Sequence, residues 1–101
     1  MNNHIFQSYI DNITQYYGIT QKVLFSPRRD YESLEKRRLF FYLCNKKGIP
    51  VVRIQKFLQK QGYEIHHSNI VRGIKKMNTV IQSNEDYQKI IKRLEKITVY
   101  A

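Results

Sequence analysis

The chain has 101 residues, 42% of them hydrophobic, which suits one domain with a modest core. Its 18 Lys and Arg residues outnumber its 8 Asp and Glu residues, and the resulting formal charge of +10 favours an anionic partner over a neutral one. One cysteine excludes an internal disulfide, no apolar run approaches the roughly 20 residues of a membrane span, and no secretory signal opens the chain, so we expect a cytoplasmic, nucleoid-associated protein.

The first half of the chain is expected to form three helices. Apolar residues at helical spacing predict the first over residues 5–17, and Gly18 can take the left-handed conformation that ends it. Thr20 is expected to cap a short second helix. Because Pro27 disfavours helix at the residue before it, a loop should precede the longest helix, which we place over residues 32–47.

The second half is expected to form three more helices, so the predicted fold class is all-α with about six helices. Pro50 suits the first turn of the fourth helix. A turn over residues 62–65 follows, longer than the three or four residues usual in a helix-turn-helix. Residues 83–86 read Ser-Asn-Glu-Asp, which predicts a capping box for the final helix. The β-leaning runs at residues 51–52 and 97–100 are too short to build a sheet.

The fifth helix, over residues 67–80, is the one around which the chain is organised. Its apolar residues recur at helical spacing, which predicts a buried stripe of Ile70, Ile74, Met77 and Ile81. Polar residues occupy roughly the opposite arc: Ser68, Arg72, Lys75, Lys76 and Thr79. A turn that opens a helix with one apolar and one cationic side is typical of insertion into a DNA major groove.

The positive charge is concentrated in the middle of the chain. Between Arg28 and Lys76 lie 13 basic and 4 acidic residues, and 13 − 4 gives +9 of the total charge of +10. Arg28 and Arg29 fall on the predicted loop, where they are either solvated or able to enter a minor groove. Arg37 and Arg38 meet the unfavourable positive end of a helix dipole, which suggests that they serve a partner, although pairing with a nearby acid is the alternative.

Several segments together resemble the C-terminal DNA-binding domain of the bacterial replication initiator DnaA, a Trp-repressor-like helix-turn-helix domain. The likeness spans roughly residues 5–97. Residues 9–13 and 16–19 are similar to its opening helices, 26–29 to its basic loop, and Arg37 with the Tyr-Leu-Cys run at 42–44 to its third helix. The most specific match is the signature helix, which here reads His-His-Ser-Asn-Ile and ends in a basic pair and Met.

The resemblance implies sequence-specific binding of double-stranded DNA in replication initiation at an origin. It implies that His67 and Ser68, at the start of the recognition helix, contact bases or flanking backbone and that Arg29 enters the minor groove. The base-contacting set that we predict is Arg29, His66, His67, Ser68 and Asn69. Cations beside this helix would contact phosphates and supply most of the affinity: Arg28, Arg37, Lys46, Lys47, Lys56, Arg72, Lys75 and Lys76.

The chain also departs from the family pattern. His66 stands where the family has an Asp, and Asn69 stands in place of its second Thr, so the bound sequence need not be the family's initiator box. The preceding loop is about three residues longer. The phosphate-binding loop of the full initiator's ATPase is missing, so this chain is either a stand-alone relative or an excised domain.

Catalysis and metal binding find little support in the sequence. Cys44 lies in an apolar run, which predicts a buried thiol rather than a nucleophile. The adjacent histidines have no Cys or carboxylate at ligand spacing, so we expect no metal, no cofactor, no small-molecule substrate and no enzymatic activity. Two alternatives to an initiator-like role stay open: a transcriptional regulator of Trp-repressor-like type, and a basic module that binds an acidic protein or RNA.

Overall fold

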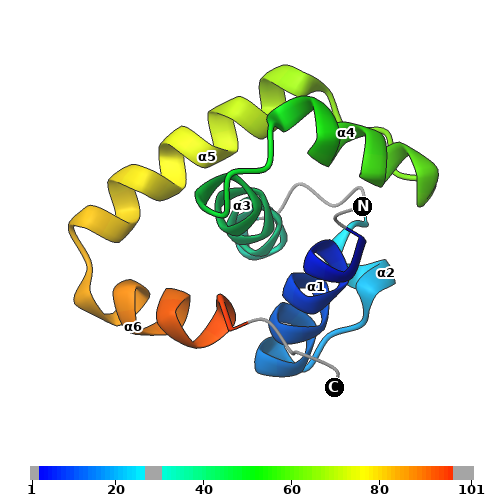
Figure 1. The fold of residues 1–101 in the computed structure, drawn as a ribbon. Helices are drawn as coiled ribbons and strands as arrows, with labels where there is room; N and C mark the ends of the chain where they lie inside the picture. The colour runs from blue at the N-terminus through cyan, green and yellow to red at the C-terminus, as the bar shows by residue number, and fades with distance from the viewer. Residues whose placement is uncertain (1–2, 27–30, 97–101) are drawn as a thin grey trace.

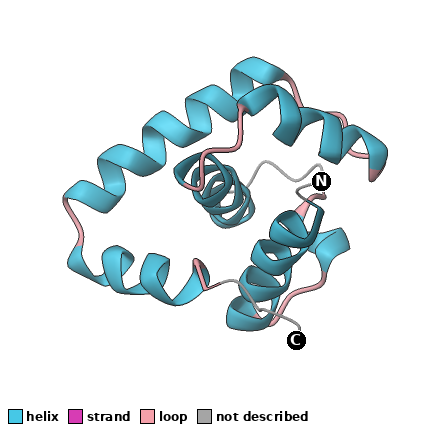
Figure 2. Cartoon of the chain, in the orientation of Figure 1, coloured by secondary structure: helices cyan, strands magenta, loops and turns pink. Residues whose placement is uncertain are grey.

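In a computed structural model, which describes residues 3–26 and 31–96, the chain forms six α-helices and no strand within those ranges. The helices are α1 (Asn3–Tyr17), α2 (Gln21–Leu24), α3 (Tyr31–Lys46), α4 (Val51–Lys60), α5 (His67–Gln82) and α6 (Glu85–Leu94) (Figures 1 and 2). The all-α prediction is therefore confirmed. No helix in the described part of the chain is both long and apolar enough to cross a membrane.

The first two helices follow their local signals. Gly18 has φ +65°, the left-handed conformation that ends α1, and the side chain of Thr20 accepts a hydrogen bond from the backbone N–H of Val23 at 3.2 Å. Both predictions are confirmed. The segment 27–30, which carries Arg28 and Arg29, lies outside the described residues.

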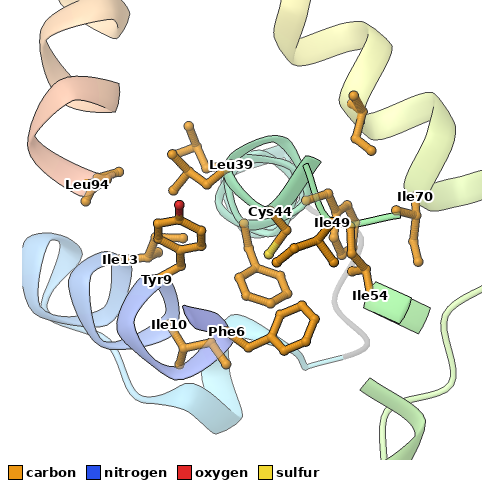
Figure 3. Packing of buried hydrophobic residues seen from close by; sticks show 14 of the residues in the cluster. Phe6, Tyr9, Ile10, Ile13, Leu39, Cys44, Ile49, Ile54, Ile70 and Leu94 are labelled. Carbon is orange, nitrogen blue, oxygen red and sulfur yellow. The ribbon is translucent and has the colours of Figure 1, made fainter. Parts of the chain in front are cut away.

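The core is built around α3, which Figure 1 shows nearly end-on between α5 on one side and α1 with α6 on the other. Leu39, Phe40 and Cys44 of α3 are completely buried, and their neighbours come from almost every other helix (Figure 3). Burial raises the pKa of the Cys44 thiol well above its ordinary value, so the prediction of a structural thiol is confirmed.

The α4–turn–α5 unit differs from prediction only at its ends. Pro50 is the N-cap of α4 rather than a residue of its first turn, and its carbonyl accepts hydrogen bonds from the amides of Arg53 and Ile54. The turn takes up residues 61–66, and Gly62 adopts φ +88° within it. The β-leaning pair at residues 51–52 lies inside α4, because the apolar residues that follow have helical rather than alternating spacing.

The final helix packs back against α1. Its cap is Asn84, whose side chain accepts hydrogen bonds from the amides of Asp86 and Tyr87; the predicted capping box on Ser83 is wrong, because Ser83 closes α5 instead. At the other end, the side-chain amide of Asn12 in α1 donates to the carbonyls of Leu94 and Lys96 at 2.8 and 2.7 Å. These two hydrogen bonds satisfy carbonyls that the end of a helix would otherwise leave unpaired.

Candidate nucleic-acid interface

The N-terminal turn of α5 exposes its polar side chains. His66 is the N-cap, but its side chain makes no capping hydrogen bond. The first hydrogen bonds of the helix are accepted by the backbone carbonyl of His66, from the amides of Asn69 and Ile70. All four residues predicted to contact bases in this segment are exposed: His66, His67, Ser68 and Asn69. Since capping does not occupy the imidazole of His66, it stays available for a ligand.

The two sides of α5 differ in exposure as the sequence predicted. The stripe of Ile70, Ile74, Met77 and Ile81 is buried, and the stripe of Ser68, Arg72, Lys75, Lys76 and Thr79 is exposed. The helix extends to Gln82, two residues beyond the predicted end. The cations therefore project along one side of a rigid element whose other side is held by the core.

A close crossing of α5 over α3 brings cations of the two helices together. A Cβ at Gly73 would lie 2.9 Å from Cγ of Arg38 and 3.2 Å from Cδ2 of Phe41, so only glycine permits this approach. Beside the crossing is a groove of about 520 Å³, lined by Arg37, Arg38 and Phe41 of α3, Asn69 and Arg72 of α5, and the turn residues Glu64 and His66. Residues of two segments distant in the sequence, 34–41 and 64–73, thus form one surface.

The charge balance of this groove is positive. Among the described residues, three arginines (Arg37, Arg38 and Arg72) line it against one carboxylate, Glu64. Nε of Arg37 also donates to the carbonyl of Ser33 at 3.4 Å, which directs its guanidinium along α3. A concave surface lined with arginines favours phosphates, while Asn69 supplies the amide pair that matches an adenine edge.

The turn before α5 is held from two sides. The side-chain amide of Gln55 in α4 donates to the carbonyl of Ile65 at 3.1 Å, and Tyr63 packs against Phe25 with ring centroids 4.8 Å apart. These contacts fix the start of α5 relative to both α4 and the end of α2. The turn is longer than usual for a helix-turn-helix, but contacts from α4 and from the end of α2 hold its residues Ile65 and Tyr63 in place.

Other residues predicted to contact DNA lie elsewhere. Lys56 is exposed on α4. Lys46 and Lys47, at the end of α3, do not line the groove; they line a separate hollow with Lys92 and Lys96. Lys46 is hydrogen-bonded to Glu95 at 2.8 Å, and this bond raises the pKa of Lys46.

Sequence reasoning missed two features of the charged surface. Glu64 was not assigned a role, because nothing local indicates that the turn folds over α3. The basic residues of α6 and of the segment just after it were also overlooked, although a signal existed: Lys89, Lys92, Arg93 and Lys96 follow i, i+3, i+4, i+7 spacing, and all four are exposed.

Among residues 3–26 and 31–96, no three or more His, Cys, Asp or Glu side chains gather where they could hold a metal ion. Comparison of the chain with models of known protein families, with curated proteins and with solved structures finds no match.

Proposed function

We propose that this protein is a sequence-specific double-stranded DNA-binding domain that places α5 in the major groove. The observation that carries the proposal is the groove at the α3–α5 crossing, where Arg72 and Asn69 lie beside Arg37 and Arg38. A major groove admits an α-helix, side chains at its N-terminal end reach base edges, and flanking cations hold the phosphates. In this role His66, His67, Ser68 and Asn69 read bases, while Arg37, Arg72, Lys75 and Lys76 bind the backbone.

The proposal includes a minor-groove contact by the loop that carries Arg28 and Arg29. The described residues on both sides of the loop lie near the reading surface, by which we mean the exposed start of α5 together with the groove beside it. Phe25 packs on Tyr63 of the turn, and Leu34 lines the groove. A narrow minor groove attracts arginine because its negative potential is enhanced. These contacts of the flanking residues support a loop that starts and ends close to the start of α5.

The resemblance to the C-terminal domain of DnaA supports an initiator-like mode, in which one monomer binds one asymmetric site. The proposed setting is the bacterial nucleoid, with a role in replication initiation at an origin. Because His66 and Asn69 depart from the family pattern, the proposed target differs from the family's initiator box.

The test is selection of binding sites from a random duplex pool, followed by variants on the enriched site. Arg72→Ala is expected to weaken binding by about the same factor, roughly 5- to 10-fold, on every sequence, because a phosphate contact carries no base information. Ser68→Ala and Arg29→Ala are expected also to relax the preference at particular base pairs.

The outcomes separate the alternatives. Enrichment of no motif, or a motif unchanged by Ser68→Ala and Arg29→Ala, contradicts reading by α5. A palindromic motif bound by a dimer would instead indicate a regulator of Trp-repressor-like type. Competition by RNA at lower concentration than by duplex DNA would indicate an RNA-binding module.

A further inference from the structure

A second cationic surface is separate from the groove at the start of α5 and shares no lining residue with it. It is formed by two lysines at the end of α3 and two at the end of α6; we call these four residues the α6 patch: Lys46, Lys47, Lys92 and Lys96. They surround a hollow of about 470 Å³, whose lining includes the buried Tyr9 and Leu43. The patch is concave and cationic at its rim.

The position of the patch is fixed by contacts that do not involve the reading surface. Asn12 of α1 holds the last carbonyls of α6, and Lys46 pairs with Glu95, so the ends of α3 and α6 are locked together. The start of α5 lies beside α4, whereas α6 turns back toward α1 (Figure 1). Because α3 lies between them, the two surfaces lie on different sides of the molecule.

Stabilisation of helix ends does not account for so much charge. The C-termini of α3 and α6 each carry roughly half a negative charge, so together they can use about one cation. The four cations of the patch, less the carboxylate of Glu95, leave +3. The acids of α6 that could offset this charge, Glu85 and Asp86, lie in its first turn at the far end of the helix.

The chemistry of the patch fits a duplex backbone better than bases or single strands. All four of its cations are lysines, which contact phosphates as point charges and read no sequence. Single strands are bound by stacking on exposed aromatic rings, whereas the tyrosine that lines this hollow, Tyr9, is only 2% exposed.

From these observations we propose that the α6 patch binds the backbone of a second DNA duplex, so that one molecule bridges two duplex segments. The bridge rests on the proposed function of α5 for its first duplex. The second contact is independent of sequence and acts through phosphates alone. It assigns Lys46 and Lys47 to the second duplex rather than the first.

A two-duplex retention assay tests the bridge with the full chain. One unlabelled duplex carrying the selected site is immobilised, and a fluorescent duplex of unrelated sequence is offered in solution at low salt. The wild-type protein is expected to retain the fluorescent duplex. Lys92→Gln/Lys96→Gln is expected to bind the immobilised duplex within about twofold of wild type but to retain at least about fivefold less of the second, because two phosphate contacts are lost.

Lys22→Gln/Lys36→Gln is the matched control, because it removes the same charge from exposed Lys22 of α2 and from Lys36 on the first half of α3. It is expected to bridge like wild type. Equal loss of both duplexes by Lys92→Gln/Lys96→Gln would overturn the proposal, since the patch would then share one duplex with α5. Wild-type retention by that variant would also overturn it, and would indicate bridging by a dimer through two copies of α5.

Failure of the bridge and failure of the proposed function give different results. A wild-type protein that binds the selected site but never retains a second duplex overturns the bridge alone. Loss of sequence preference together with persistent binding through Lys92 and Lys96 overturns the role of α5 alone. Stronger retention of single-stranded DNA or duplex RNA of equal length would overturn the assignment of the patch to duplex DNA.

Discussion

At the residue scale, burial raises the pKa values of a few side chains in the core. Tyr9 is only 2% exposed, and burial raises its pKa to about 12, with smaller contributions from Cys44 and Glu95. The same cause raises the pKa of Tyr17 to about 12. Tyr17 lies outside the proposed DNA surfaces, and Tyr9 is buried beneath the hollow of the α6 patch, so their titration reports on the stability of the fold.

Tyr9→Phe is expected to reduce the fall in the free energy of unfolding that occurs at alkaline pH. Between about pH 10 and 12 the unfolded chain releases the Tyr9 proton while the folded chain keeps it, so the free energy of unfolding falls as pH rises. From pH 8 to 11.5 the wild-type protein should lose about 2 kcal/mol more than Tyr9→Phe. Urea unfolding at the two pH values measures this difference, and parallel curves for both proteins would contradict it.

At the element scale, the crossing of α5 over α3 decides whether a groove exists. The approach depends on Gly73, although glycine inside a helix costs about 1 kcal/mol relative to alanine. An alanine would avoid this cost, but its Cβ would lie only 2.9 Å from Cγ of Arg38 and 3.2 Å from Cδ2 of Phe41. The residue that weakens the helix is therefore the one that brings Arg38 beside Arg72.

Gly73→Ala is expected to lower the free energy of unfolding by about 1–2 kcal/mol, because overpacking outweighs the gain in helix propensity. It should also weaken DNA binding, since α5 must move away from Arg37 and Arg38. Asn78→Ala, at an exposed position of the same helix, is the control and should be neutral or slightly stabilising. Urea unfolding and duplex titration measure both effects; a Gly73→Ala protein as stable as the control would show that the close approach is not needed.

At the scale of the whole molecule, cations gather on two separate surfaces, the groove beside α5 and the α6 patch. Charge counting along the chain hid the second of these. Residues 77–101 carry four cations and three acids, so they appear nearly neutral, yet two of the cations, Lys92 and Lys96, line the patch, while two of the acids lie in the first turn of α6. Net charge over a segment therefore misrepresents what a helix presents to a partner.

Binding of one duplex through α5 is expected to depend steeply on salt. About five or six phosphate contacts, each releasing roughly 0.9 counterion, predict a slope near −5 in a plot of log K against log salt. Arg72→Ala should reduce the magnitude of this slope by about 1, and Lys22→Ala should leave it unchanged. Titration with a short duplex between 50 and 200 mM salt provides the measurement, and a slope close to zero would rule out a backbone-dominated interface.

What the sequence determined by itself was local. The helices, their Gly and Thr boundary signals and the buried stripe of α5 could be predicted because each depends on residues within a few positions of one another. The exposure of Ser68, Arg72 and Lys76 followed from the same periodicity. Where prediction failed locally, at the Ser83 capping box, two neighbouring residues competed for one role and Asn84 took it.

Only the tertiary structure decided which cations share a surface. Arg37 and Lys46 lie on one helix and were predicted to contact the same duplex, yet Arg37 lines the groove with Arg72 while Lys46 pairs with Glu95. The grouping depends on the crossing at Gly73 and on the bond from Asn12 to Leu94, which joins residues 82 positions apart. No periodicity in the sequence encodes such contacts, because they arise from how the six described helices pack together, with α3 at the centre.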